Sequence, residues 1–219
     1  MGKHCSGCSA CDAICPVNAI KMAVNNEGFY RPIVDEHICI NCDLCEKVCM
    51  ISEGNPVVED IGKFGLYSAY SSDNNVRSVS SSGGIAYELI KQNIHKENFY
   101  FCGAIYDEDN RITKHEIFGS EDKYNIEKLK GSKYMQSQNA SAYKEIVKKD
   151  AGIIFGTPCQ IAGIDMVLRK RNKRDSFLLV DIFCHGVPSY NLWRHYLRYL
   201  NKEVGICENP SVQFRNKNL

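Results

Sequence analysis

The sequence predicts an α+β protein in which a small cysteine-rich unit precedes a larger α/β domain with a partly parallel sheet. Eight of the twelve cysteines lie before position 50, so they serve a local structure and not the whole fold. Farther along, apolar runs alternate with helical patterns, as in parallel strands joined by helices. With 219 residues, 44% hydrophobic and 24% charged, the chain has a globular composition and is long enough for one core and a small appendage.

The cysteine-rich unit contains the same spacing twice. The pattern C-x2-C-x2-C-x3-C is formed first by Cys5, Cys8, Cys11 and Cys15, and again by Cys39, Cys42, Cys45 and Cys49. Three closely spaced thiolates bind three irons of one 4Fe-4S cluster, and the fourth cysteine of each run serves the other cluster. The sequence therefore predicts a two-cluster ferredoxin domain, in which Cys49 completes the first site and Cys15 the second.

Zinc and disulfides are the alternatives for these cysteines. Four zinc ligands need only two C-x2-C pairs, so a structural zinc protein leaves one cysteine of each run unexplained. No basic-then-apolar leader precedes Cys5, so we expect a cytoplasmic protein, whose thiols stay reduced. Met50 stands where the first run has Pro16, but proline supplies no ligand and the cluster prediction is unaffected.

The two cysteine runs are connected by a predicted hairpin over residues 27–34. Turn formers and charges over residues 53–63 indicate a linker. We therefore expect a dicluster ferredoxin domain at residues 1–56 and an α/β domain at residues 64–219.

In the α/β domain, the apolar patterns predict alternating strands and helices. The expected strands are 64–71, 99–106, 112–118, 152–155 and 177–183, and the expected helices are 84–94, 121–130, 141–149, 157–170 and 189–200. Ser189 is the expected N-cap of the last helix. The strand–helix–strand order over residues 152–183 implies a parallel pair with a right-handed crossover. Ligands of open parallel sheets bind at the carboxyl ends of the strands.

The loops after these two parallel strands contain the candidate catalytic residues Cys159, Cys184 and His185. Cys159 opens a helix, where free backbone N–H groups and the helix dipole stabilise a thiolate. We predict that the three side chains line one cofactor site, as proton donors, additional cluster contacts or walls of the cavity. The other cysteines and histidines of the body are expected to be structural, with Cys102 and Cys207 buried and His95, His115 and His195 on the surface.

Four further motifs follow the cysteine runs. They are Ser81-Ser82-Gly83-Gly84, Gly131-Ser132-Lys133-Tyr134-Met135-Gln136-Ser137, the segment 156–163 (GTPCQIAG) and the segment 181–189 (DIFCHGVPS). In this order they resemble the family of coenzyme F420 hydrogenase/dehydrogenase beta subunits, and the resemblance covers nearly the whole chain. It implies an FAD-binding body that passes electrons between the clusters and a two-electron acceptor, either coenzyme F420 or another organic substrate. Members of the family continue for a further C-terminal segment, so we expect this chain to be truncated and its second domain incomplete.

The resemblance also implies which residues bind FAD. They are Ser82, Gly83, Gly84, Lys133, Tyr134, Gln136, Ser137, Thr157, Pro158 and Gln160. A glycine pair at a helix start lets backbone N–H groups approach a phosphate. A cation near the flavin N1 region stabilises the anionic reduced ring, which favours Lys133, although most lysines are simply exposed.

The leading hypothesis is thus an iron–sulfur flavoprotein oxidoreductase, and the alternative is an electron-relay subunit that docks a partner enzyme and has no catalytic activity of its own. The expected partners are a redox protein or a hydrogenase/dehydrogenase subunit and a small-molecule acceptor, with no nucleic acid and no membrane span. Residues 1–60 carry 4 Lys/Arg against 9 Asp/Glu, and the remainder 23 against 17. An acidic electron-carrying unit therefore precedes a basic body, a difference that bears on association and not on fold.

Overall fold

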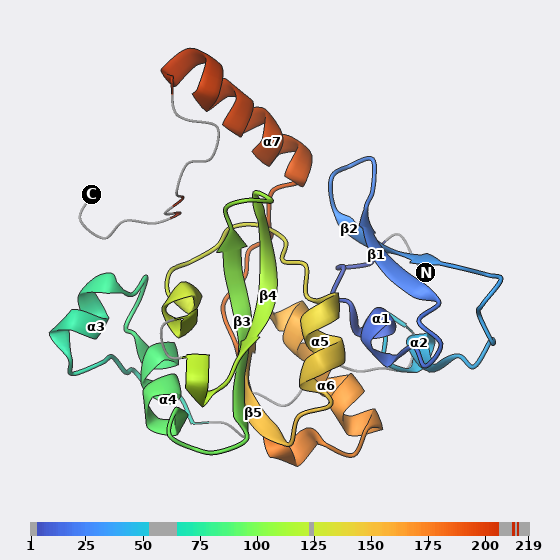
Figure 1. Cartoon of the computed structure of the whole chain (residues 1–219), viewed down its shortest axis with the longest axis horizontal. Coiled ribbons are helices and arrows are strands. Elements are labelled where there is room, and N and C mark those ends of the chain that lie inside the picture. The colour runs from blue at the N-terminus through green and yellow to red at the C-terminus, as the bar shows by residue number, and fades with distance from the viewer. Residues whose placement is uncertain (1–3, 53–64, 123–124, 206–211, 213, 215–219) are drawn as a thin grey trace.

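The computed structural model describes residues 4–52, 65–122, 125–205, 212 and 214, and these residues form the predicted α+β fold (Figure 1). The N-terminal unit consists of α1 (Ala10–Ile14), β1 (Ile20–Val24), β2 (Tyr30–Val34) and α2 (Leu44–Lys47). β1 and β2 pair antiparallel, which confirms the predicted hairpin. The turn is closed by Asn25, whose Oδ1 accepts hydrogen bonds from the N–H groups of Glu27 and Phe29 at 3.1 and 3.0 Å.

The body contains a four-stranded sheet in the order β4-β3-β5-β6. Its strands are β3 (Phe99–Asp107), β4 (Ile112–Phe118), β5 (Ala151–Gly156) and β6 (Phe177–Asp181). β3 and β4 form an antiparallel hairpin, whereas β5 pairs parallel with both β3 and β6. The sheet is therefore partly parallel, as predicted, and its parallel connections contain helices.

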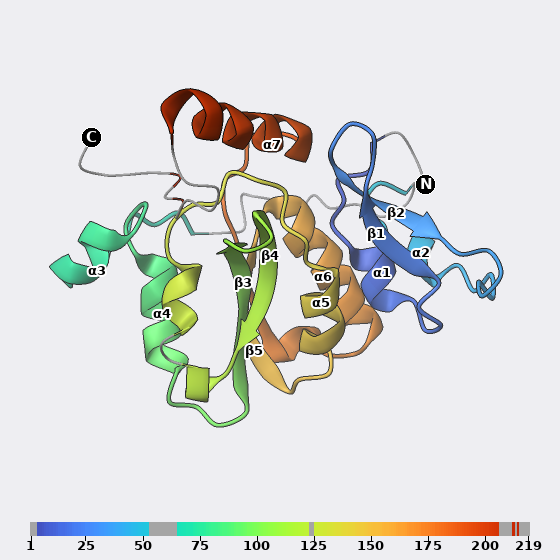
Figure 2. The same ribbon diagram turned by 45° about the horizontal axis from the view of Figure 1, so that its top comes forward.

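Helices cover both faces of this sheet, and others lie outside these faces (Figure 1). They are α3 (Asn74–Val79), α4 (Ile85–Asn93), α5 (Ala140–Ile146), α6 (Pro158–Lys170) and α7 (Tyr190–Tyr199), with 3-10 helices at Ser120–Asp122, Asn125–Leu129 and Arg174–Ser176 and a π-helix at Leu200–Val204. α5 and α6 lie between the sheet and the N-terminal unit, and α4 lies on the opposite side (Figures 1 and 2). Ser189 is the N-cap of α7, as predicted, because its Oγ accepts the N–H of Leu192 at 3.2 Å.

One apolar core extends through both units. Between the sheet and α5 and α6 it contains Cys102, Tyr143, Ile146, Ile154, Ile164, Val167 and Leu168, and it continues into Ala10, Ala13, Ile14 and Val48 of the N-terminal unit. Cys102 is fully buried, which confirms its predicted structural role. A second core on the other face joins Ile90 of α4 to Phe101 and Ile153. The N-terminal unit is therefore packed onto the body by the body's own core.

Two predicted elements are wrong. Residues 65–71 contain no strand, and Leu66 and Tyr67 are 99% and 87% exposed, because no neighbouring strand pairs with this segment. Where one α-helix was predicted over residues 121–130, the described residues form two short 3-10 helices. The predicted linker at 53–63, with its domain boundary, and Cys207 lie outside the described residues. In the part of the chain that the structure describes, no helix combines the length and apolar character needed to cross a membrane.

Candidate functional site

The two cysteine loops share one unusual backbone conformation. In the first loop, Gly7 and Ser9 have φ of 73° and 64°, and in the second, Asn41 and Asp43 have φ of 50° and 57°. These positions are equivalent, because each pair flanks the second cysteine of its run. Left-handed residues turn the chain tightly, and the same two positions of both loops adopt this conformation although three of the four residues are not glycine. The loops are thus built to wrap similar objects, which fits one cluster for each.

The thiols of the first loop are suited to bind a cationic metal centre. Burial, with the neighbouring Cys159 and Cys5 thiols, raises the pKa of Cys8 to about 11. Burial, with the Cys8 and Cys5 charges, raises the pKa of Cys11 to about 12. The thiolate forms therefore need compensating positive charge. Among the described residues, no three Cys, His, Asp or Glu side chains converge on one point as the ligands of a single metal ion would. In a cubane each thiolate binds a different iron, so its ligands need not converge in this way.

Backbone N–H groups also point at the cysteine sulfurs. Gly7 N donates to Cys5 Sγ at 3.4 Å, and Ala19 N donates to Cys15 Sγ at 3.2 Å. Hydrogen bonds of this kind raise the reduction potential of an iron–sulfur cluster.

The two loops differ in exposure. Around the first, Gly7, Ser9 and Ala10 are buried against the body. Around the second, Cys42 is exposed, and so are several neighbouring apolar side chains, namely Ile33 (62%), Ile38 (45%), Ile40 (58%) and Ile51 (44%). The first cluster site is therefore the one next to the body, and the second is the one nearer solvent.

The segment that precedes α5 holds the first loop in position. Asn139 is fully buried, donates from Nδ2 to Cys8 O at 3.0 Å and accepts at Oδ1 from Ser9 Oγ at 2.6 Å. Gln136 donates from Nε2 to Ser6 O at 3.1 Å and accepts at Oε1 from Tyr30 N at 2.6 Å. The side chains of Asn139 and Gln136 therefore form hydrogen bonds between the body and the N-terminal unit. Gln136, predicted to bind a cofactor, uses its amide here.

The carboxyl ends of the parallel strands meet, as predicted. Gly156 of β5 pairs with Asp181 of β6, and Ile182 N donates to Gly156 O at 3.1 Å. α6 begins directly afterwards, with Thr157 as N-cap and Pro158 in the first turn. Thr157 N donates to Gln160 Oε1 at 3.0 Å, so Gln160 closes a capping box.

The candidate catalytic residues lie in different surroundings. Cys159 is half-buried in the first turn of α6, with its Sγ 3.3 Å from Thr157 Oγ1. Cys184 and His185 are exposed, in a loop where Gly186 N donates to Cys184 Sγ at 3.4 Å. Their loops open on one edge of the sheet, and Cys159 lies near Cys8 of the first cysteine loop, with which its thiol interacts electrostatically.

Lys133, His115 and Ser137 form a polar group beside the end of β5. His115 Nδ1 lies 2.7 Å from Ser137 Oγ, and its Nε2 lies 3.1 Å from Phe155 O. His115 is 5% exposed, so its predicted surface position is wrong. Its side chain points to the buried face of β4, where both ring nitrogens have hydrogen-bond partners. Lys133 Nζ donates to the carbonyls of Lys128 and Lys130 at 2.7 and 2.8 Å, and burial lowers its pKa to about 8.

The glycine-rich motif lies next to this group. Gly84, with φ of 84°, is the N-cap of α4, so free N–H groups of the helix start there. Ser132 N donates to Ser81 Oγ at 2.8 Å and joins this motif to the one that carries Lys133 and the exposed Tyr134. Ser82 and Gly83 complete the turn, with Gly83 O accepting from Ser71 N at 2.7 Å.

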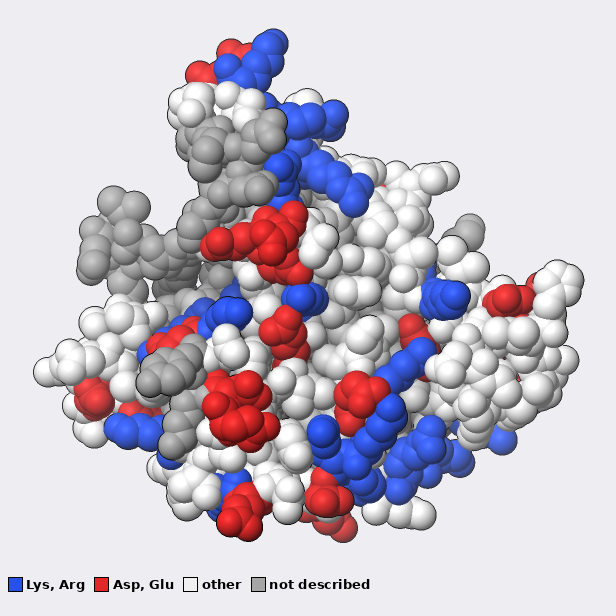
Figure 3. Space-filling view, viewed as in Figure 1, with Lys and Arg blue, Asp and Glu red and all other residues white. Residues whose placement is uncertain are grey.

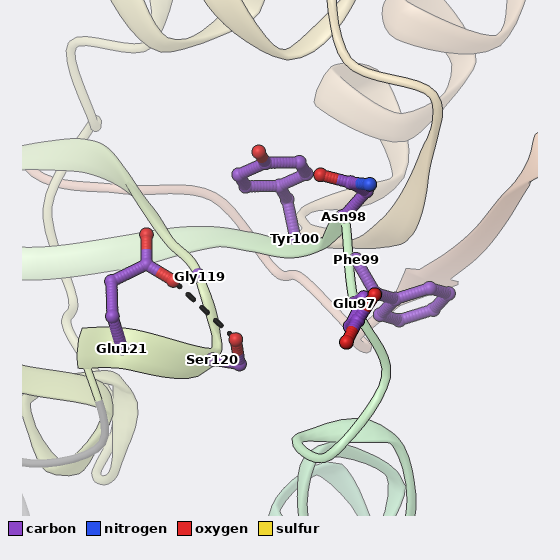
Figure 4. A pocket seen from close by; sticks show the side chains of 7 residues that line it. All are labelled: Glu97, Asn98, Phe99, Tyr100, Gly119, Ser120 and Glu121. Carbon is purple, nitrogen blue, oxygen red and sulfur yellow. Dashed lines mark hydrogen bonds between the residues drawn. The ribbon is translucent and has the colours of Figure 1, made fainter.

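A separate polar hollow occurs at the other end of the sheet, where β3 begins. It measures about 250 Å³ and is lined by Glu97, Asn98, Phe99, Tyr100, Gly119, Ser120 and Glu121 (Figure 4). Its size is below the usual range for ligand pockets, and none of the predicted site residues line it. It belongs to a different region from the strand-end loops.

Comparison with known proteins agrees with this geometry. Residues 4–52 match the 4Fe-4S dicluster domain, and residues 150–215 match the C terminus of the coenzyme F420 hydrogenase/dehydrogenase beta subunit. The resemblance to the family of coenzyme F420 hydrogenase/dehydrogenase beta subunits is confirmed. The chain is therefore an iron–sulfur electron-transfer protein with two 4Fe-4S sites.

Two proteins to which the chain is similar bear on this comparison. One subunit of the F420H2 dehydrogenase of Methanosarcina mazei is 24% identical over an alignment of 188 residues, and the alignment covers 82% of this chain and 53% of that protein. The chain thus spans about half the length of this curated relative. A chain of the F420-reducing [NiFe] hydrogenase complex from Methanosarcina barkeri is 20% identical, with a TM-score of 0.48 over 72% of this chain and 58% of that one.

Sequence patterns missed three residues that shape the site. Asn139 lies just beyond the quoted motif, and a buried asparagine has no periodic signature. His115 sits in a strand whose buried face includes the polar Thr113. Gly163 closes the GTPCQIAG motif and was not assigned a role, although a glycine inside a helical pattern is itself a signal of close packing.

Proposed function

We propose that this chain is an iron–sulfur flavoprotein oxidoreductase that passes electrons between its two 4Fe-4S clusters, FAD and a two-electron acceptor such as coenzyme F420 or another organic compound. The observation that carries the proposal is the difference between the two cysteine loops. The first packs against the body beside the strand-end loops through its buried Gly7, Ser9 and Ala10, and the second exposes Cys42 and the residues on either side of it. Such an arrangement gives a relay one end inside the molecule and one end at its surface.

The eight cysteines fit two clusters. Their spacing, the matching left-handed positions and the N–H groups directed at Cys5 and Cys15 are what a pair of cubanes requires. Cys5, Cys8 and Cys11 with Cys49 would hold the cluster next to the body, and Cys39, Cys42 and Cys45 with Cys15 the outer one. The contacts between α1 and α2 support this exchange of the fourth ligands.

The residues near the strand ends fit a flavin in part. Gly83 and Gly84 open the nine-residue α4, whose free N–H groups suit the pyrophosphate of FAD. Ser82, Lys133 and the exposed Tyr134 are joined to them through the Ser81–Ser132 hydrogen bond. Thr157 and Pro158 begin α6 at the end of β5. Gln136, Ser137 and Gln160 would support these segments from behind, since their side chains are engaged inside the protein.

When bound, FAD would supply the conversion between single-electron exchange with the clusters and hydride exchange with the organic acceptor. The chain's own residues orient and tune this chemistry. The Lys133 ammonium, anchored on two carbonyls, would oppose negative charge on the reduced ring. Cys184 and His185, exposed beside the end of β6, are available to hold or move a proton for the acceptor. Cys159 faces the first cysteine loop and would act on the cluster side.

The outer loop is the end that a partner would contact. We propose a redox protein or a hydrogenase/dehydrogenase subunit as this partner, in a cytoplasmic setting that keeps the cysteines reduced. The exposed isoleucines around Cys42 would supply the apolar part of that contact.

The second candidate function is a relay subunit that docks a partner enzyme and has no catalysis of its own. The engagement of Gln136, Ser137 and Gln160 in internal hydrogen bonds favours it, because these side chains are not presented to a cofactor. Under this alternative the strand-end loops serve only packing and docking.

Flavin content distinguishes the two candidates. The protein would be purified without oxygen, reconstituted with iron and sulfide, supplied with FAD and desalted before absorption spectroscopy. About eight irons per chain together with acid-released FAD are expected for the oxidoreductase. Eight irons without retained FAD would support the relay, and loss of FAD in Lys133→Met but not in Lys91→Met would identify the flavin site.

A further inference from the structure

Gly163 is an unusual residue for its position. It is buried in the middle of the 13-residue helix α6, although glycine is among the weakest helix formers. Its conformation is that of an ordinary helical residue, so backbone freedom does not account for it. A glycine without a conformational role in a helix indicates that another group approaches the backbone closely.

The group that approaches Gly163 is a cluster ligand. A Cβ built on Gly163 would lie 2.9 Å from Cys8 Sγ, 3.3 Å from Cys8 Cβ and 3.2 Å from Ala10 Cβ. The first of these distances is shorter than a carbon–sulfur contact allows, so only glycine fits here without a shift of the Cys8 side chain or of its loop.

The loop cannot shift easily. Asn139 holds the Cys8 carbonyl at 3.0 Å and the Ser9 hydroxyl at 2.6 Å. Ala10 is fully buried in the core that joins the two units. The position of Cys8 against α6 is therefore fixed from both sides.

Cys159 lies on the same face of α6. It precedes Gly163 by four residues, one helical turn, so both point toward the first cysteine loop. The Cys8 and Cys159 thiols are close enough to interact electrostatically. Thr157 Oγ1 lies 3.3 Å from Cys159 Sγ, which ties this face to the end of β5.

We propose that the Cys159–Gly163 face of α6 is the surface of the body against which the first cluster is held, and that Gly163 is the positioning residue that sets this contact at Cys8. The inference rests on the proposed binding of a cluster by Cys8 but requires no flavin. It gives Gly163 a role that the sequence motifs did not give it. It also gives Cys159 a role at the first cluster that differs from the roles proposed for Cys184 and His185.

The test measures the two cluster potentials in the reconstituted full chain without added FAD, by redox titration followed with electron paramagnetic resonance. A Cys8→Ala variant first identifies which signal belongs to the first cluster. Gly163→Ala is then expected to shift the midpoint potential of that cluster and to leave the other unchanged. Gly163→Val, with two further methyl groups, is expected to lose it, so that iron falls from about eight to about four per chain.

Two further variants complete the test. Cys159→Ala removes the thiol from the same face and is expected to shift the same potential as Gly163→Ala. Gly205→Ala adds the same methyl group where no heavy atom lies within 4 Å, and because Gly205 has φ of 70° it also adds backbone strain. Both potentials should stay at their wild-type values, which would show that neither an added methyl group nor local strain as such shifts them.

The proposal is overturned if Gly163→Ala and Cys159→Ala leave both potentials unchanged, or if they shift both clusters equally. Because every readout is made without flavin, this result is independent of whether FAD binds. A chain that retains FAD but shows unshifted potentials would leave the oxidoreductase intact and remove the α6 contact.

Discussion

Asn139 connects the body to the first cysteine loop through both ends of its side-chain amide. Its removal leaves Cys8 O and Ser9 Oγ without their partner in a buried site. Asn139→Ala is therefore expected to destabilise the protein by about 1–3 kcal/mol. Denaturant unfolding of the reconstituted protein under anaerobic conditions measures this change.

The matched control for Asn139 is Gln92→Ala, an amide on the exposed face of α4. It should change the free energy of unfolding by less than about 0.5 kcal/mol. Equal stability of the two variants would contradict the bridging role of Asn139.

His115 makes stability depend on pH. Burial lowers its pKa to about 4 in the folded protein, whereas in the unfolded chain it titrates near the ordinary value of about 6.5. The unfolded state therefore binds a proton first as pH falls. The contribution of His115 is fully present above about pH 6.5 and declines by up to about 3 kcal/mol on the way to about pH 4.

The free energy of unfolding, followed across this interval, should fall more steeply for wild type than for His115→Gln. The control is His95→Gln, because His95 is exposed and its loss should leave the slope unaltered. A His115→Gln protein with the wild-type slope would show that another group governs this pH range.

At the scale of elements, apolar runs predicted the body sheet and most of its helices. The runs at β5 and β6 are too short for helices and are followed by helical patterns, so their parallel pairing could be inferred. The sequence at 64–71 alternates apolar and polar residues as a strand does, but the described residues 65–71 have no neighbouring strand to pair with. A sequence pattern reports which residues tolerate burial and not whether a partner is there to bury them.

The candidate site was predictable in its location and not in its contacts. Strand order located Cys159 and Cys184 at one sheet edge, because parallel strands share their carboxyl ends. The buried face of β4 includes the polar residues Thr113 and His115. The sequence therefore suggested that this face was exposed. The contact of Gly163 with Cys8 joins residues 155 positions apart, which no local pattern encodes.

The start of α6 depends on Gln160. Its Oε1 accepts the N–H of Thr157, so Gln160→Leu leaves that N–H unpaired at the end of β5 and should cost about 1–2 kcal/mol. Gln160→Glu keeps an acceptor at a helix start, where the dipole offsets part of the cost of burying its charge, so it should lose less stability than Gln160→Leu. Thermal unfolding of both variants measures the difference, and equal losses would show that the capping box is unimportant.

At the scale of the whole molecule, the shared core makes the two units one body with two different ends. Lys and Arg side chains gather over α7 and beneath α5 and α6, while the N-terminal unit is mostly uncharged on this face (Figure 3). Around the outer cysteine loop, the exposed charges include Asp35, Glu36 and Asp43. An apolar surface with an acidic rim favours a partner with an apolar patch edged by lysine and arginine.

This arrangement predicts how electrons leave the reduced protein. Cytochrome c, a basic one-electron acceptor, should be reduced by the dithionite-reduced, desalted protein at a rate that falls as salt increases. Glu36→Lys reverses one rim charge without touching a cysteine, so it should slow the reaction several-fold at low salt and have little effect at high salt. Glu203→Lys makes the same change on the π-helix after α7, away from the outer loop, and should react like wild type. If Glu203→Lys slows the reaction as much as Glu36→Lys, or salt has no effect, electrons do not leave through the outer loop.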